Sequence, residues 1–203
     1  IKRRNLTLKQ RFQRDKHFKD EYTKFMKDLT DQGYAQRCRE PGGHAEESAW
    51  YLPHHSVHNP KKPDKFRVVL DCSAGYQGRN INAELLQGPD MTNSLVVVFQ
   101  RFRKEEVAFT ADVKAMFYQV RIPKDQRRFV RFLWWPDGDT SKELCDYEMC
   151  VHPFGAVSSP GCANFALRQP AADNKERFGS AAHETIHKTS MSMIVQSQSP
   201  AVR

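Results

Sequence analysis

Asp112 is the residue of this chain whose type and position most favour chemistry. It directly follows residues 107–111, in which side chains alternate as they do in a buried strand. A carboxylate at the end of a core strand is suited to bind a metal ion or to act as a general base. It is also suited to cap a following helix, and Asp112 taken alone favours the cap.

A second group of chemically suited residues is cationic. Residues 59–65 have the composition of a turn and carry Lys61, Lys62 and Lys65, and the β-rich residues 66–71 that follow include Arg67. Lysine offers a point charge and arginine a guanidinium that can form two parallel hydrogen bonds, so this hairpin is suited to bind phosphates. A solvated hairpin tip has the same composition, and the pattern alone leaves both interpretations open.

The cysteines and histidines do not predict a zinc site. The five cysteines are odd in number and include no CxxC pair, so we expect a reducing compartment and no disulfide framework. Cys145, Cys150 and His152 lie in a strand-like run, where positions five apart face opposite sides. The three histidines within residues 54–58 have no carboxylate or cysteine to complete a site, and we expect a surface or packing role for them.

Length, hydropathy and charge narrow the class of protein. The 203 residues suit one large domain or part of an enzyme with several subdomains, and because the chain begins at Ile1 we expect a piece of a longer protein. No apolar run is long enough to span a bilayer and no signal peptide is recognised, which disfavours membrane and secreted proteins. The net charge is +8, and residues 1–40 hold 12 Lys and Arg against 6 Asp and Glu. This fits contact with a polyanion, although a solvated basic helix has the same composition.

Helical spacing predicts the elements that position these residues. Residues 15–29 carry an apolar stripe at that spacing, and Gly33 predicts the end of this helix. A short helix is predicted near residues 81–86, and a further helix follows with its apolar stripe formed by Leu95, Val98, Phe99 and Phe102.

The later part of the chain predicts a pair of strands followed by a helix. Residues 127–135 alternate charged and apolar side chains, which predicts a half-exposed strand with a basic face. Residues 144–150 form the returning strand. Ser158 or Ser159 then caps a helix that Pro160 starts, because proline is tolerated in a first turn.

Five separate segments resemble the reverse transcriptase domain of retroelement polyproteins, most closely that of BEL/Pao-type LTR retrotransposons. The resemblance covers roughly residues 15–188, and five segments in the right order make it specific where one alone would be weak. With this resemblance, a metal-binding role for Asp112 is favoured over a role as a helix cap. The segments are Trp50-Tyr51-Leu52-Pro53-His54-His55, Lys65-Phe66-Arg67-Val68-Val69-Leu70-Asp71-Cys72-Ser73-Ala74, Leu85-Leu86-Gln87-Gly88-Pro89-Asp90, Ala111-Asp112-Val113-Lys114-Ala115-Met116-Phe117 and His152-Pro153-Phe154-Gly155-Ala156-Val157-Ser158-Ser159-Pro160.

The resemblance implies an α+β fold, a right-hand polymerase with fingers and a partial palm in which an antiparallel sheet packs on helices. We expect a basic N-terminal arm and amphipathic helix in residues 1–40, a fingers-like region in 41–105, a partial palm in 106–188 and an out-of-frame or disordered tail in 189–203. In this family the strand that ends at Asp112 is polymerase motif A, and Asp112 would hold both catalytic Mg²⁺ ions. One ion lowers the pKa of the primer 3′ hydroxyl, and the other stabilises the leaving pyrophosphate.

The same resemblance assigns roles to further residues. Phe117 matches the position whose ring crowds a 2′ hydroxyl and so favours deoxynucleotides. Lys65 and Arg67 match the fingers strand that contacts the incoming triphosphate. Phe154, Gly155, Ser159 and Pro160 match motif B, which shapes the nucleotide pocket and touches the template. Lys61 and Lys62, in the basic hairpin, would lie beside nucleic acid.

The second pair of carboxylates that this family needs is missing from the sequence. A Tyr-x-Asp-Asp hairpin is expected soon after residue 188, but residues 189–203 contain no Asp or Glu. If Thr189, Ser190, Ser192, Ile194 and Val195 use the codons ACT, TCT, TCG, ATT and GTC, a two-base shift reads Phe-Tyr-Val-Asp-Asp-Cys. The second Asp of that reading is forced, because the last base of the Met193 codon joins the first two of Ile194 as GAT. We therefore expect a frameshift or a wrongly joined reading frame here. The alternative is a genuine, divergent tail, for which the free choice of codons produces the Tyr-x-Asp-Asp reading by chance.

These observations predict a reverse transcriptase (RNA-directed DNA polymerase) fragment, a nucleotidyltransferase that is catalytically incomplete as it stands. The alternative is a non-catalytic nucleic-acid-binding remnant, which would bind in a salt-dependent way without metal-dependent extension. Expected partners are an RNA or DNA template-primer, a dNTP and the rest of the pol polyprotein. The expected location is intracellular, in the cytoplasm or a virus-like particle. The chain has no GxSxG, HExxH or GxxxxGK[ST] motif, which disfavours an unrelated hydrolase.

Overall fold

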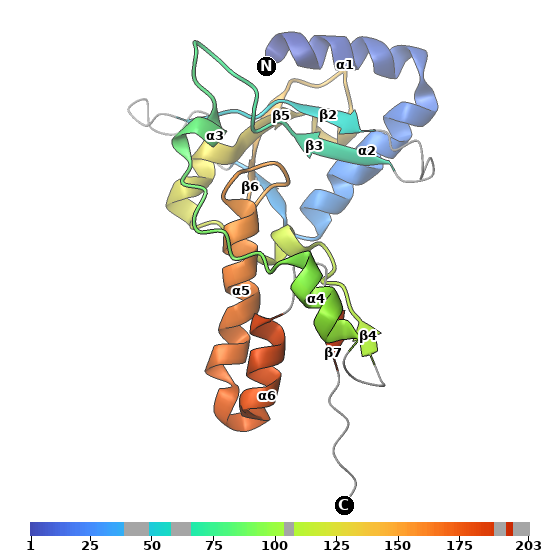
Figure 1. Ribbon diagram of the computed structural model, residues 1–203. Helices are drawn as coiled ribbons and strands as arrows, with labels where there is room; N and C mark the ends of the chain where they lie inside the picture. The colour runs from blue at the N-terminus through green and yellow to red at the C-terminus, as the bar shows by residue number, and fades with distance from the viewer. Residues whose placement is uncertain (39–48, 58–65, 104–107, 189–193, 197–203) are drawn as a thin grey trace, which may run out of the picture. The chain divides into compact units, whose positions relative to one another are not determined.

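The computed structural model of the 203-residue chain describes residues 1–38, 49–57, 66–103, 108–188 and 194–196. It has α+β architecture with small antiparallel sheets (Figure 1). The chain divides into two compact units. The first contains Ile1–Leu86 and Phe117–Ser159, and the second contains Gln87–Met116 and Pro160–Arg203.

Two helices open the first unit, α1 (Lys2–Arg14) and α2 (Lys16–Asp31). Asp15 separates them because its backbone is extended, and its carboxylate accepts a hydrogen bond from the backbone N–H of Phe18 at 2.9 Å. Helix α2 buries Phe18, Tyr22, Met26 and Leu29, which confirms the predicted amphipathic stripe. Burying each such side chain stabilises the fold by about 1.5–3 kcal/mol.

Gly33 ends α2 as predicted. Its φ of +67° is in the left-handed region that glycine adopts without strain. The N–H of Gly33 bonds to the carbonyl of Thr30, and the N–H of Tyr34 bonds to the carbonyl of Leu29 at 3.0 Å. These bonds close the helix end as in a Schellman motif and turn the chain directly into β1 (Ala35–Arg37).

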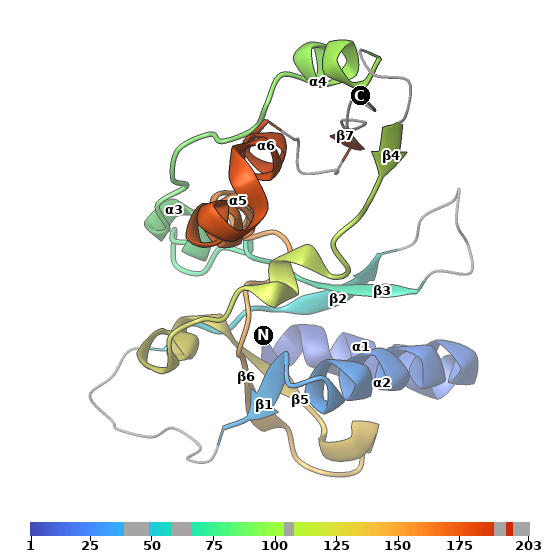
Figure 2. The ribbon, with the colours of Figure 1, turned by 90° about the horizontal axis from the view of Figure 1, so that it is seen from below.

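The first unit contains a three-stranded antiparallel sheet of order β1–β6–β5, with β5 at Arg131–Trp134 and β6 at Cys145–Met149. Ala35 pairs with Met149, and Phe132 pairs with Tyr147. The rings of Phe132 and Tyr147 stack with centroids 5.7 Å apart. Figure 2 shows this sheet beside α1 and α2, which supply the other side of the core.

The strand predicted for residues 127–135 is wrong in its first part. Residues Lys124–Val130 form a 3-10 helix, η2, and β5 begins only at Arg131. The η2 segment follows Pro123, and its first five residues are charged or polar and include no β-branched residue to favour a strand. The Nε of Arg127 also donates to the carbonyl of Ile122 at 3.0 Å, which holds the side chain on the local backbone.

A hairpin of β2 (His54–Val57) and β3 (Arg67–Leu70) forms the second sheet of this unit. His54 pairs with Leu70, and Val57 pairs with Arg67. The hairpin tip with Lys61, Lys62 and Lys65 lies outside the described residues. Helix α3 (Ile81–Glu84) follows near the predicted position, and the side chain of Asn80 caps it through the N–H of Ala83 at 2.9 Å.

The core of the first unit is aromatic and contains one buried histidine. Tyr22 stacks on Trp134 with ring centroids 5.5 Å apart, and Phe12 packs edge-on against Tyr22. The hydroxyl of Tyr22 donates to Nδ1 of His54 at 2.5 Å, and Nε2 of His54 donates to the carbonyl of Leu133 at 2.9 Å. The carbonyl can only accept, so these partners define the neutral tautomer of His54. His54 is therefore a packing residue that links α2, β2 and β5.

The second unit contains α4 (Leu95–Phe102), β4 (Ala108–Thr110), α5 (from Ser159 to Asp173), α6 (Lys175–His187) and β7 (Ile194–Gln196). Strands β4 and β7 are antiparallel, and Thr110 pairs with Ile194. Strand β7 lies within the stretch for which an out-of-frame or disordered tail is expected. Three side-chain hydrogen bonds connect residues 91–101 to α5 and to the end of α6. Arg168 donates to the carbonyl of Met91 (2.6 Å), Asn93 to that of His187 (3.2 Å) and Arg101 to that of Lys188 (3.2 Å).

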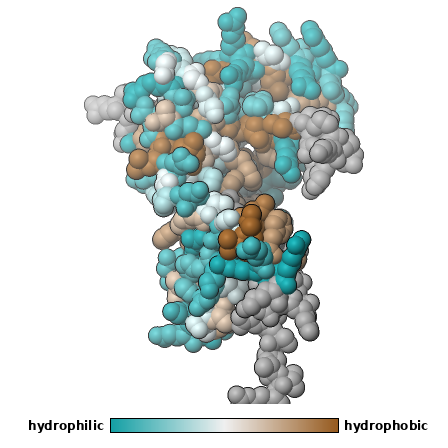
Figure 3. All heavy atoms as spheres, in the orientation of Figure 1, coloured by the Kyte–Doolittle hydropathy of each residue, from teal (hydrophilic) through white to brown (hydrophobic). Residues whose placement is uncertain are grey.

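Helix α4 forms as predicted but exposes part of its apolar stripe. Val98 is buried, whereas Leu95 is 58% and Phe99 46% exposed, and Val96, outside the stripe, is 65% exposed. Figure 3 shows hydrophobic spheres gathered over this helix. Within the described part of the chain, no helix is both long and apolar enough to cross a membrane.

Candidate functional site

The candidate site of the first unit is built where the chain leaves β6. The N–H of Ile122 bonds to the carbonyl of Cys150 at 2.9 Å, and the N–H of His152 bonds to the carbonyl of Val120 at 3.0 Å. An isolated antiparallel bridge between Arg121 and Val151 lies between these bonds. The segment after the 3-10 helix η1 (Met116–Gln119) is thereby tied to the loop that follows β6.

This pairing brings Phe117 against Phe154. Their ring centroids are 4.8 Å apart at 64°, and Tyr118 meets the same Phe154 ring at 5.1 Å. Tyr34 packs on the other side of Tyr118 at 4.8 Å, and burial, with a smaller contribution from Tyr34, raises the pKa of Tyr118 to about 12. Phe154 is 43% exposed and Phe117 is half-buried. The cluster is thus an apolar wall with one open ring, which is suited to contact a flat ring or a sugar.

Gly155 allows the loop to turn directly after Phe154. Its φ is +97°, a conformation that an L side chain adopts only with strain. A Cβ on Gly155 would lie 3.6 Å from the carbonyl oxygen of Leu70, so the loop runs close to the end of β3. Arg67 is exposed at the start of the same strand, three residues before Leu70.

Two side chains hold the backbone of this loop. The hydroxyl of Ser159 donates to the carbonyl of Pro153 at 2.9 Å and lies 3.5 Å from Nδ1 of His152, and Ser159 is fully buried. Burial also lowers the pKa of His152. On the other side of Phe154, the amide of Asn82 bonds to the carbonyl of Gly155 and to the N–H of Val157, both at 3.0 Å.

Asp112 belongs to the second unit, where it is exposed and follows β4 by two residues. No helix begins at Asp112, because the next helical turn starts at Met116, so the capping interpretation does not hold. In the residues that the structure describes, no group of three His, Cys, Asp or Glu is arranged to hold a metal ion. A single exposed carboxylate does not fit a two-Mg²⁺ site.

The structure groups some of the predicted site residues and not others. Phe117, Phe154 and Gly155 lie together in the first unit, and the buried Ser159 supports them. Asp112 and the exposed Pro160 belong to the second unit. Lys61, Lys62 and Lys65 lie outside the described residues.

Sequence reasoning missed Asn82 and the packing role of Tyr118. A signal for Asn82 exists in the sequence, because Asn80 and Asn82 both stand at the start of a helix and only one residue caps it. The other amide is then available for a distant partner. Nothing in the sequence identifies the carbonyl of Gly155 and the N–H of Val157 as that partner.

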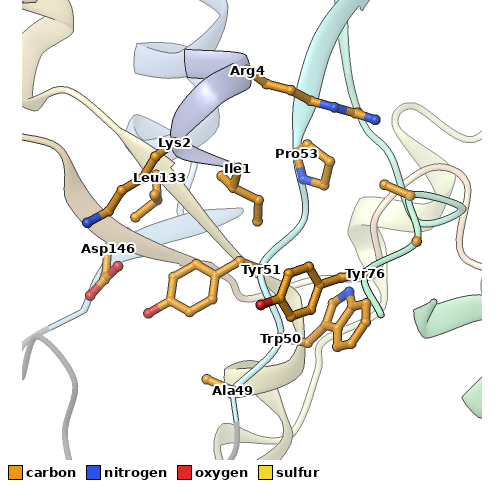
Figure 4. A pocket seen from close by; sticks show the side chains of 12 residues that line it. Ile1, Lys2, Arg4, Ala49, Trp50, Tyr51, Pro53, Tyr76, Leu133 and Asp146 are labelled. Atoms are coloured by element: carbon orange, nitrogen blue, oxygen red, sulfur yellow. The ribbon is translucent and has the colours of Figure 1, made fainter. Parts of the chain in front are cut away.

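A separate hollow of about 560 Å³ lies in the first unit beside the start of α1 (Figure 4). Aromatic side chains of Trp50, Tyr51 and Tyr76 line it together with the charged residues Arg4 and Asp146. Arg4 also forms an ion pair of 3.2 Å with Asp71 at its rim. None of the predicted site residues lines this hollow, so it is distinct from the wall formed by Phe117 and Phe154.

Comparison with known proteins gives no family assignment. A scan of protein-family models and a search of curated proteins both find no match to this chain. Its function is therefore inferred from the residues and contacts described above.

Proposed function

We propose that this chain is a fragment of a reverse transcriptase domain from a BEL/Pao-type LTR retrotransposon polyprotein. In this proposal the nucleotide wall is formed but the second catalytic Asp pair is missing. The resemblance supplies the roles of Phe117, Phe154 and Gly155. The support from the structure is that these residues, far apart in the sequence, form one cluster with an open face.

The observation that carries the proposal is the pairing of β4 with β7. Thr110, two residues before Asp112, pairs with Ile194. In the shifted reading frame the Asp pair is encoded across the codons of Ser192, Met193 and Ile194. The segment from which the carboxylates are missing thus leads directly into the strand that pairs with the strand before Asp112. In the proposed polymerase, the missing Asp pair would lie beside the strand that precedes Asp112.

The residues of the wall have separate tasks in the proposed site. The Phe117 ring excludes a 2′ hydroxyl by its bulk, while Phe154 and the open backbone at Gly155 contact the base and sugar. Arg67, exposed on β3, offers its guanidinium to the triphosphate as a charge-assisted donor. These contacts bind and orient a nucleotide without performing chemistry on it.

The chain as it stands is expected not to extend a primer. Two-metal phosphoryl transfer needs both the attacking and the leaving oxygen to be bridged by ions, and Asp112 alone does not hold two ions. Residues 189–203 contribute no carboxylate in this reading frame. Nucleotide binding without extension is therefore the expected activity.

The first test is to sequence the coding DNA and its transcript from codon 180 to beyond codon 203. A shifted frame that continues as Tyr-x-Asp-Asp and then as further palm sequence supports a frame-broken polymerase. Codons that do not permit that reading refute the frameshift and make the tail genuine.

The second test restores the shifted frame and measures extension of a DNA primer on an RNA template with Mg²⁺ and dNTPs. The restored chain should extend the primer, and the unrestored chain should not. Asp112→Asn in the restored chain should abolish extension, whereas Asp125→Asn, at an exposed position in η2, should leave it unchanged. Extension that survives Asp112→Asn would refute the assignment of this residue.

A non-catalytic nucleic-acid-binding remnant is the second candidate function, and the surface of α1 favours it. This helix exposes a series of cations, Lys2, Arg3, Arg4, Arg11 and Arg14. If they contact phosphates, affinity for single-stranded RNA should fall steeply between 50 and 200 mM salt, and replacing Arg3 and Arg14 by Glu should reduce that slope. Binding that is insensitive to salt would exclude this function.

A further inference from the structure

Asn82 makes a two-point contact with the loop that carries Phe154. Its Nδ2 donates to the carbonyl of Gly155 and its Oδ1 accepts from the N–H of Val157, each at 3.0 Å. A carbonyl can only accept and an amide N–H can only donate, so the partners fix the orientation of the Asn82 amide. Both bonds cross more than 70 residues of sequence, and together they enclose the buried Ala156.

The local helix does not need this amide. Helix α3 is capped by Asn80, whose Oδ1 accepts from the N–H of Ala83, and it packs through the buried Ile81. The Asn82 side chain points instead to the loop after β6. The Asn82 side chain thus stabilises the loop after β6 rather than α3.

Phe154 lies between two fixed points of the backbone. Ser159 holds the carbonyl of Pro153 just before it, and Asn82 holds the carbonyl of Gly155 just after it. Phe154 itself is 43% exposed, and its ring packs edge-on against those of Phe117 and Tyr118. Because the ring is partly open to solvent, its position depends also on the backbone bonds on either side.

We propose that Asn82 is a positioning residue for nucleotide binding, which acts by holding Phe154 against Phe117. This inference rests on the proposed function, because it assigns the wall to a nucleoside triphosphate. If the Phe154 loop loosens, the wall loses both contact area and its fixed separation from the sugar. Affinity for a triphosphate should then fall, and so should the preference for a deoxyribose over a ribose.

The experiment uses the full 203-residue chain with ring-labelled phenylalanine and follows the NMR signals of Phe117 and Phe154. The probes are dCTP and CTP, which differ only in the 2′ hydroxyl. Asn82→Ala should weaken dCTP binding about tenfold, since it removes two hydrogen bonds. It should also lower the ratio of dCTP to CTP affinity and speed exchange of the Val157 amide.

Asn80→Ala is the matched control. It removes a side-chain hydrogen bond of similar length from the same helix, but it does not touch the loop. This variant should melt at a temperature similar to that of Asn82→Ala while retaining the affinity and the dCTP to CTP ratio of the unsubstituted chain. Asn82→Asp is the second variant if Asn82→Ala does not fold. It keeps the acceptor for the N–H of Val157 but places a carboxylate oxygen against the carbonyl of Gly155, so a loss of at least about threefold is expected.

The outcomes separate this inference from the proposed function. If the unsubstituted chain binds neither triphosphate at the two rings, the proposed function is refuted, and the positioning role with it. If the unsubstituted chain binds dCTP and a folded Asn82 variant binds it equally well with the same ratio, only the Asn82 inference is overturned. A loss of affinity and ratio in the Asn82 variants but not in Asn80→Ala supports it.

Discussion

Acidification from pH 7 to pH 5 should destabilise the first unit through His54. This imidazole is fully buried, donates to the carbonyl of Leu133 and accepts from the hydroxyl of Tyr22. Burial, the largest cause, lowers its pKa from 6.5 to about 4. Among the residues that the structure describes, no carboxylate contributes to the pKa of His54, and the nearby His55 adds to the lowering.

The sign and size follow from linkage between protonation and folding. Above pH 6.5 the histidine is neutral in both states, so stability does not depend on it. As the pH falls from 6.5 toward 4, the unfolded chain binds a proton that the folded chain does not bind, and stability is lost throughout this window. The loss from this residue is about 2 kcal/mol at pH 5 and about 3 kcal/mol below pH 4. Losses of this size are large against a typical domain stability of about 5–15 kcal/mol.

Urea unfolding followed by tryptophan fluorescence measures this loss directly. Trp134 is a suitable reporter, because its ring centroid lies 5.8 Å from that of His54. The pH dependence between 7 and 5 should be much smaller in His54→Gln, which keeps polar groups but does not titrate. His55→Gln is the control at an exposed position on the same strand and should retain most of the dependence, because His55 makes only a minor contribution to the lowered pKa of His54. The pKa of His152 is also lowered by burial and contributes with the same sign, which leaves a residual slope in His54→Gln.

Two results would refute this reasoning. One is an NMR titration that gives His54 a pKa near 6.5 in the folded chain. The other is an equal loss of stability between pH 7 and pH 5 in His54→Gln and in the unsubstituted chain.

Three further predictions concern the loop, the nucleotide wall and α4. Gly155→Ala should lower the free energy of unfolding by about 1–2 kcal/mol in urea titrations, because φ is +97° there, whereas Gly75→Ala, without a positive φ, should cost less. In the restored-frame chain, Phe117→Ala should raise ribonucleotide incorporation at least about tenfold relative to deoxynucleotides, as measured by competitive primer extension; an unchanged ratio would exclude Phe117 from sugar discrimination. Replacing Leu95 and Val96 by Lys should raise solubility without lowering the melting temperature, since both side chains are more than half exposed. A fall in melting temperature by several degrees would show that these two side chains are packed in solution.

Local signals in the sequence predicted helix α2 well. Asp15 and Gly33 mark the start and end of α2 through bonds to residues at most five positions away, so the sequence around them contains the information. Residues 127–130 misled the strand prediction. Their charged and apolar side chains resemble the start of a half-exposed strand, but they belong to the 3-10 helix that begins after Pro123.

The candidate site was harder to predict, because its contacts are distant in sequence. The resemblance identified Phe117, Phe154 and Gly155 separately, yet their grouping depends on backbone bonds such as that from His152 to Val120. Asn82 carries no pattern that marks its partners 73 and 75 residues away. The pairing of β4 with β7 could not be predicted from the sequence either, because residues 194–196 have no alternation that predicts a strand.

The division of the chain into two interleaved units has a consequence for its synthesis. Every residue of the first unit has been translated once the ribosome passes Ser159, whereas β7 of the second unit is translated last. Domains generally fold as units during synthesis, with earlier ones folding first. A change of reading frame after residue 188 therefore leaves the first unit with its full complement of residues. Such a change alters the segment that pairs with β4, whereas Phe117, Phe154 and Gly155 are encoded before it and are unchanged.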